Sequence, residues 1–146
     1  MHGPVLALLT FLFALRVLGQ AIVAFVGVAW LPIMEQWFSG LIPYPTLLMI
    51  QLLMLILMVK ITGEIWRDVG TFAIRRPHWS QFLIKFSAIY AGAMVFRYLS
   101  TMILHPEKRW LGDTIPIIFH FVLAGFIYIL GHYHQRALIA RANIAC

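Results

Sequence analysis

Charge is scarce in this chain. Only 11% of its 146 residues are charged, 62% are hydrophobic, and five side chains in all are acidic. A soluble domain carries about a quarter of its residues as charged side chains. A chain so poor in charge would expose large apolar patches to water. The composition therefore excludes an ordinary soluble domain and indicates a protein whose solvent is the lipid bilayer.

Cysteine is almost absent, since Cys146 is the one cysteine. That excludes a disulfide framework and a thiolate metal cluster. The net charge of +6 could suggest nucleic acid in a soluble protein. Here the basic residues lie beside apolar segments, so we assign them to the membrane surface and expect no nucleic-acid partner. The start MHGPV lacks the positive region of a cleavable signal, and we expect the first apolar segment to stay as a membrane helix.

Four apolar stretches are long enough to cross the hydrocarbon core, which takes roughly 20 helical residues. Proline and glycine punctuate the segments between them, and all five tryptophans fall at their boundaries, as in an interfacial aromatic belt. The sequence predicts a single all-α domain, an antiparallel four-helix transmembrane bundle. Its predicted spans are residues 5–31, 45–62, 81–104 and 115–132.

Basic residues predict the orientation of these spans. With four crossings, both termini and the loop between the second and third spans share one side. Seven of the eleven Lys and Arg residues lie on that side, and only Lys108 and Arg109 lie on the other, with Arg16 and Arg97 inside spans. The positive-inside rule then puts both termini in the cytoplasm, and we expect a bacterial cytoplasmic membrane.

Several polar side chains lie inside the predicted spans, where an ionisable group needs a partner or a purpose. Alternating span directions bring most of them to similar depth in the outer half of the bilayer. Arg16 is deeper, one helical turn from Gln20 on the same face. On the third span, Tyr90 and Arg97 share a face. The candidate ligand-binding residues are Arg97, Tyr98, His120, Gln51, Gln20 and Arg16.

No predicted span has a carboxylate in its central portion. The nearest acids on the outer side are in loops predicted to lie over the candidate site, together with one histidine: Glu35, His105, Glu107 and Asp113. Arg97 therefore either draws one of these carboxylates inward or meets an anion from outside the chain. The structural alternative is that the arginine snorkels, or binds backbone carbonyls and glutamine side chains.

The histidines suggest two possible haem b sites, because such a site needs two imidazoles facing each other at similar depth. His105 could pair with His120 on the outer side, and His78 with His132 or His134 on the inner side. Against this, His105 precedes a proline at the end of its span, and His78 follows one in a loop. We predict no metal site and no cofactor, with haem b or a quinone as the alternative.

The segments ALRVLGQAIVAF and LIPYPTLLMIQLL, in the first sixty residues, resemble the DoxX-type small four-helix membrane proteins. The resemblance implies a small bacterial membrane bundle associated with redox or quinone chemistry. Gln51 stands where that group is expected to have an acidic residue, so the resemblance assigns no site residues.

Three functions fit these observations. The first is a non-catalytic accessory subunit of a larger membrane complex, or a homo-oligomer, because no nucleophile motif or Ser-His-acid set favours an enzyme. The second is a membrane protein that binds an anionic or quinone-like molecule in the outer polar pocket. The third is a b-type haem electron-transfer protein.

Overall fold

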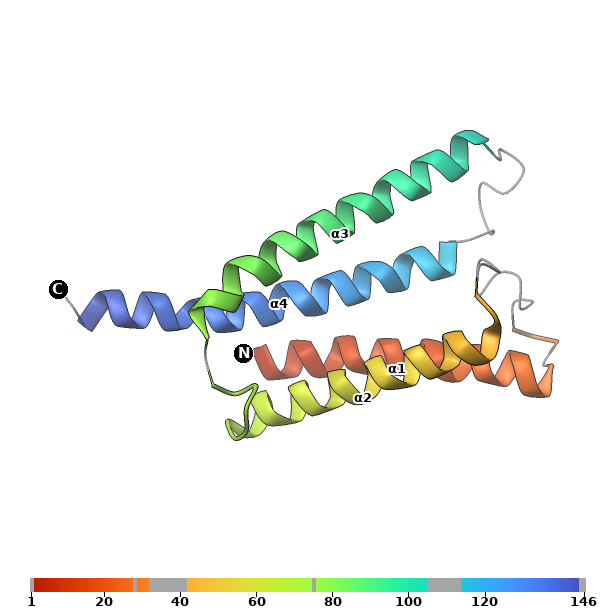
Figure 1. Ribbon diagram of the computed structural model, residues 1–146. Coiled ribbons are helices and arrows are strands. Elements are labelled where there is room, and N and C mark those ends of the chain that lie inside the picture. Colours follow the sequence, from red (N-terminus) through yellow and green to blue (C-terminus); the bar gives the residue numbers. More distant parts are fainter. Residues whose placement is uncertain (1, 28, 32–41, 75, 105–113, 145–146) are drawn as a thin grey trace.

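The computed structural model describes residues 2–27, 29–31, 42–74, 76–104 and 114–144, with only the backbone for residues 114 and 136–144. Over this part the chain is all-α, as predicted, and Figure 1 shows its helices. The predicted apolar helices are confirmed, because each is long and apolar enough to cross a membrane. The helices are α1 (His2–Val26), α2 (Tyr44–Arg67), α3 (Pro77–Leu104) and α4 (Thr114–Ile144), with Ile115–Gln135 as the apolar part of α4.

Two helix ends differ from the sequence prediction because local backbone geometry sets them. α1 ends at Val26 rather than at residue 31. The next residue, Gly27, takes a φ of 65°, which glycine adopts at little cost. α2 continues to Arg67 rather than residue 62. It ends where Asp68 adopts the left-handed conformation and the Val69 N–H donates to the Glu64 carbonyl at 3.1 Å.

Proline lies in the first turn of all four helices of the described part of the chain. Pro4 is in α1, Pro45 in α2 and Pro116 in α4, while Pro77 is the first residue of α3. A proline there costs no hydrogen bond, because the first N–H groups of a helix have no intrahelical acceptor. α3 therefore begins at Pro77 rather than at residue 81.

The helices pack in three pairs over the described residues: α1 with α2, α1 with α4, and α3 with α4. Figure 1 shows α1 and α4 in the middle of the arrangement, with α2 and α3 on its two sides. The chain reverses direction from each helix to the next, so the N-terminus lies toward the same end as the C-terminus.

The hydrophobic core lies among α1, α2 and α4. Leu6 is fully buried, and Phe126 is 2% exposed. Thr10 and Thr62 add a hydrogen bond of 3.0 Å between α1 and α2. The cluster consists of Leu6, Phe13, Val17, Met58, Ile61, Ile65, Phe126, Leu130 and Tyr133.

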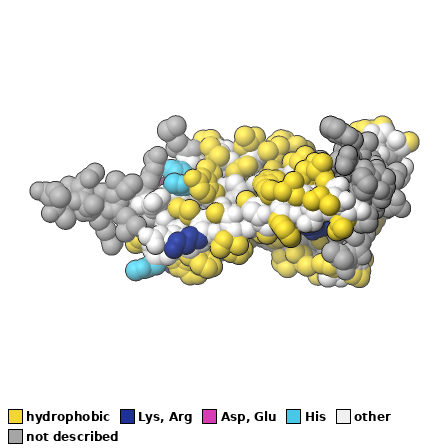
Figure 2. All heavy atoms as spheres, turned by 90° about the horizontal axis from the view of Figure 1, so that it is seen from above, with side chains coloured by type: hydrophobic (Ala, Val, Ile, Leu, Met, Phe, Trp, Pro, Cys, Tyr) yellow, Lys and Arg dark blue, Asp and Glu magenta, His cyan; other side chains and the backbone are white. Residues whose placement is uncertain are grey.

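α3 contributes no residue to that cluster and leans away from α4 toward Leu104 (Figure 1). Its described buried residues are Ser80 and Ser87, in the first half of the helix. Near there Gly131 of α4 allows close contact, because a Cβ at residue 131 would lie 2.8 Å from Ile84 Cγ1. Figure 2 shows hydrophobic side chains over the middle of the face seen from above, with basic side chains toward the ends. Such a face suits contact with lipid.

A polar cavity as the candidate functional site

A cavity of about 210 Å³ lies among the four helices, and several polar side chains of their apolar segments line it. α1 contributes Arg16, α2 contributes Gln51, and α3 contributes both Tyr90 and Arg97. His120 comes from α4, where it lies beside Phe119 and the first-turn Pro116. Residues distant in the sequence thus meet in one place inside four apolar helices. We call this space the polar cavity.

Two glutamines join α1 to α2 at the polar cavity. The Gln51 Nε2 donates to Gln20 Oε1 at 3.1 Å, and both side chains are buried, at 4% and 0% exposed. Gln20 Nε2 and Gln51 Oε1 have no hydrogen-bond partner among the described residues. Exchanging oxygen and nitrogen in both amides would still leave one donor and one acceptor unused. A buried amide group without a partner is costly, so this pair can still bind a further polar group.

Tyr90 and His120 form the second polar pair of the cavity. The Tyr90 hydroxyl and His120 Nδ1 lie 2.5 Å apart, and either atom can be the donor. The two rings meet edge to face, with centroids 5.8 Å apart, and the Phe86 ring stacks on that of Tyr90, with centroids 6.1 Å apart. A hydroxyl and an imidazole in direct hydrogen bond can donate to a ligand or pass it a proton.

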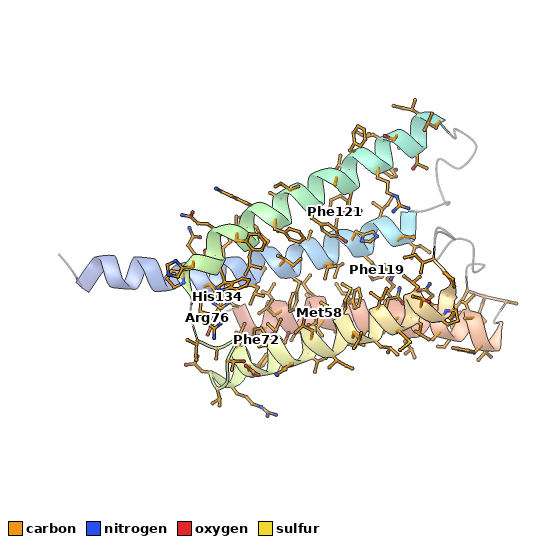
Figure 3. All side chains as sticks on the ribbon, viewed as in Figure 1. Met58, Phe72, Arg76, Phe119, Phe121 and His134 are labelled. Carbon is orange, nitrogen blue, oxygen red and sulfur yellow. The ribbon has the colours of Figure 1, made fainter. Side chains whose placement is uncertain are left out.

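Positive charge dominates the polar cavity. Arg16 is 8% exposed, and its guanidinium lies 5.4 Å from the centre of the Phe119 ring. Arg97 is half-buried on α3, and the charges of both arginines act on Tyr90 and His120. The described lining residues include no Asp or Glu. Phe119 lies on the side of α4 that faces α1 in Figure 3. Because two arginines and no described acidic residue line the cavity, it favours a negatively charged or electron-rich group.

Four of the six predicted ligand-binding residues line the cavity: Arg16, Gln51, Arg97 and His120. Gln20 joins them through its hydrogen bond to Gln51. Tyr98 is half-buried and does not belong to the described lining, and Tyr90 takes the place expected for it. The signal for Tyr90 was its spacing of seven residues from Arg97, which puts both on one helix face, whereas adjacent residues point in different directions.

The residues predicted to lie over the site fall outside the described part of the chain. These are Glu35, His105, Glu107 and Asp113.

Two histidines of the predicted haem pairs, His120 and His132, each contact a tyrosine. His78 is exposed at the start of α3, and His132 packs edge to face on Tyr128, with ring centroids 4.6 Å apart. His120 bonds to Tyr90, and its predicted haem partner His105 lies outside the described residues. Among the described residues no three His, Cys, Asp or Glu side chains come together as a metal site would require.

A larger cavity, of about 380 Å³, lies at the other end of the structure. Phe72, Arg76 and His134 lie together there in Figure 3. The backbone N–H of Arg76 donates to His134 Nδ1 at 3.2 Å, and the nearby Tyr133 hydroxyl donates to the Ala73 carbonyl at 2.8 Å. These polar groups tie the loop between α2 and α3 to α4. We therefore assign this cavity a structural role and place the candidate site at the polar cavity.

Comparisons with models of protein families, with curated proteins and with solved structures find no match for this chain. The resemblance of its first sixty residues to the DoxX-type proteins thus gains no support from them and stays a prediction.

Proposed function

We propose that this protein is a small polytopic membrane protein that binds a small molecule with a negatively charged head in its polar cavity. The observation that carries the proposal is the convergence of five polar side chains from four apolar helices on one space. Two of them are arginines, and the described lining has no carboxylate. Charged groups within a membrane span are costly, and they mark binding sites and transport pathways far more often than chance would give.

The individual contacts suit a small acidic head. Arg97 supplies a planar guanidinium with parallel N–H donors, the geometry that matches a carboxylate or a phosphate. The Tyr90 and His120 pair and the unused amide N–H of Gln20 can donate to the remaining oxygens. A quinone-like carbonyl would use the same donors but leave the arginine charge unmatched. An anion is therefore the better fit.

For the whole protein we propose an antiparallel bundle in a bacterial cytoplasmic membrane, with both termini in the cytoplasm. The distribution of Lys and Arg between the two sides of the predicted spans supports this orientation. The polar cavity, which includes Arg97, then lies in the half of the bilayer away from the cytoplasm.

An accessory role in a larger membrane complex is the second candidate, and α3 is the observation that favours it. In the most apolar 18-residue stretch of α3, only 6% is buried inside the structure. This is the smallest share among the four helices of the described part. A partner helix packed on α3 would give it the contacts that the chain itself does not. A membrane-protein partner retained in stoichiometric amount in mild detergent would support this role.

Hexanoate and hexanol, matched in chain length, test the proposed function. The protein in nanodiscs of zwitterionic lipid is titrated with each by calorimetry. We expect hexanoate to bind and hexanol not to bind. Loss of a charge-assisted hydrogen bond should weaken hexanoate roughly tenfold or more in Arg97→Gln.

Lys85→Gln is the matched control, because Lys85 is an exposed basic residue on the same helix. It should leave binding unchanged. Equal affinity for hexanoate and hexanol, or an unchanged affinity in Arg97→Gln, would overturn the proposed function.

A further inference from the structure

A third cavity, of about 310 Å³, adjoins the polar cavity. The two share Met54, Tyr90 and Leu123 as lining residues, so they meet at the side chains of α2, α3 and α4. Beyond this junction the lining is apolar, and we call the space the apolar groove. Its further walls include Leu57, Met58, Phe86, Phe126 and Ile127.

We propose that the polar cavity and the apolar groove together hold one single-chain amphiphile, with its acidic head at Arg97 and its alkyl chain in the groove. This inference rests on the proposed function and adds the chemical class of the ligand. A carboxylate and a phosphate head share the required chemistry. The polar cavity alone would accept any small anion, whereas the groove selects an anion that carries a chain.

The order of the lining residues along the helices indicates which way the alkyl chain of the ligand would extend from its head. On α3 the walls run from Arg97 through Tyr90 to Phe86, a rise of roughly 16 Å at about 1.5 Å per residue. On α2 they run from Gln51 to Ile61 in parallel. A ligand with its head at Arg97 would therefore extend its chain toward the middle of the helices, as a lipid of the same leaflet does.

The depth of Arg97 in the bundle limits the size of the ligand's headgroup. Arg97 lies seven residues before Leu104, the end of α3, which corresponds to about 10 Å below that end. A bulky headgroup belongs at the membrane surface, so a head at this depth has to be small. The two volumes, about 210 and 310 Å³, are those of one compact ligand rather than of a two-chain lipid.

The arrangement of the helices supplies an entrance from the bilayer. α2 and α3 are not a packing pair over the described residues, and the groove lies between their side chains. Leu57 on α2 is 49% exposed, and Phe86 on α3 is 46% exposed. An amphiphile already in the membrane can enter sideways between these two helices. An apolar groove has no polar partners for water, so a chain is its natural occupant.

The probe for this inference is hexadecanoic acid with a diazirine at the far end of its chain. The protein in nanodiscs of zwitterionic lipid is irradiated with the probe, and labelled residues are mapped by mass spectrometry. We expect label on groove residues such as Met58, Phe86 and Phe126. In Arg97→Gln the groove labelling should fall by at least about fivefold, because the head is no longer held.

Leu57→Trp is the second variant, since it fills the groove at a partly exposed residue that does not line the polar cavity. It should abolish groove labelling and leave hexanoate binding intact. The matched control is Leu53→Trp, one turn earlier on α2, exposed and outside both linings. This control should label like the unmodified protein.

Three results would overturn the inference while leaving the proposed function standing. The first is label spread evenly over exposed residues such as Leu53 and Ile89. The second is unchanged groove labelling in Leu57→Trp, and the third is unchanged groove labelling in Arg97→Gln, in each case with hexanoate still bound through Arg97. A hexanoate that binds no better than hexanol would instead overturn the proposed function. A phosphate-headed analogue run in parallel distinguishes the two acidic heads by the stronger labelling.

Discussion

Gln51 on α2 donates a hydrogen bond of 3.1 Å to Gln20 on α1, and neither amide is fully used by that bond. Both side chains are buried. The pair therefore holds two helices together and also offers one donor and one acceptor beside the arginines. The two glutamines thus have a structural role in joining the helices and a proposed role in ligand binding, and measurements of stability and of binding test these roles separately.

Substitution of one glutamine should lower the free energy of unfolding by more than the hydrogen bond of the pair contributes to it, because the other amide is left buried without its partner. Gln51→Leu leaves Gln20 Oε1 without its donor, so we expect the free energy of unfolding to fall by about 1–3 kcal/mol. The double variant Gln20→Leu/Gln51→Leu should be less destabilised than the sum of the two single variants, because no amide is then left half-paired. Unfolding in mixed micelles measures this cycle. Strictly additive losses would show that the two amides do not interact.

Gly131 should be sensitive to an added methyl group. In Gly131→Ala the new Cβ would lie 2.8 Å from Ile84 Cγ1 and 3.2 Å from the Ile84 backbone nitrogen, forcing α3 and α4 apart. We expect a loss of about 1–3 kcal/mol in the free energy of unfolding.

Gly92→Ala is the control for that substitution, because a Cβ at residue 92 meets no heavy atom within 4 Å. It should be neutral or slightly stabilising, since alanine favours a helix over glycine by up to about 1 kcal/mol. Equal effects at the two glycines would contradict the close α3–α4 contact.

The absorption spectrum of the purified protein should lack a Soret band. The described histidines have neighbours other than each other: His120 bonds to Tyr90, His132 packs on Tyr128, and His134 accepts from the Arg76 N–H. A ligating imidazole needs a free nitrogen aimed at the iron and a partner imidazole across from it. A Soret band that disappears in His120→Ala would establish the haem alternative.

Cys146 provides a direct test of orientation, because it is the one cysteine of the chain. With both termini in the cytoplasm, a membrane-impermeant maleimide should not label it in intact cells and should label it after permeabilisation. Lys108→Cys in a Cys146→Ser background is the control, and it should be labelled in intact cells. The opposite pattern would reverse the proposed orientation.

The apolar helices could be predicted from the sequence because hydropathy is a local property of each segment. The shared level of Gln51, Arg97 and His120 along the helices could be predicted as well by counting residues at a fixed rise, and the structure puts all three at the polar cavity. Helix ends were less predictable. Gly27 and Asp68 end their helices through backbone conformation that hydropathy does not report.

The rotation of α3 was harder to predict. Tyr90 and Tyr98 are both near Arg97 in the sequence, and only the packing of α3 on α4 brings Tyr90 to His120. Hydrophobic patterning gave little help, because lipid is as apolar as a neighbouring helix and leaves each face free to point outward.

The amino-acid sequence is enough to establish that this protein is all-α, that its helices suit a bilayer, and that cationic and amide groups lie inside them. Those properties follow from composition and from the length of apolar segments. The packing of the helices was needed to show that one cavity is shared by Arg16, Gln51, Tyr90, Arg97 and His120, and that an apolar groove continues from it between α2 and α3. The reason is that helix pairing in a membrane depends on close packing and buried hydrogen bonds between distant residues.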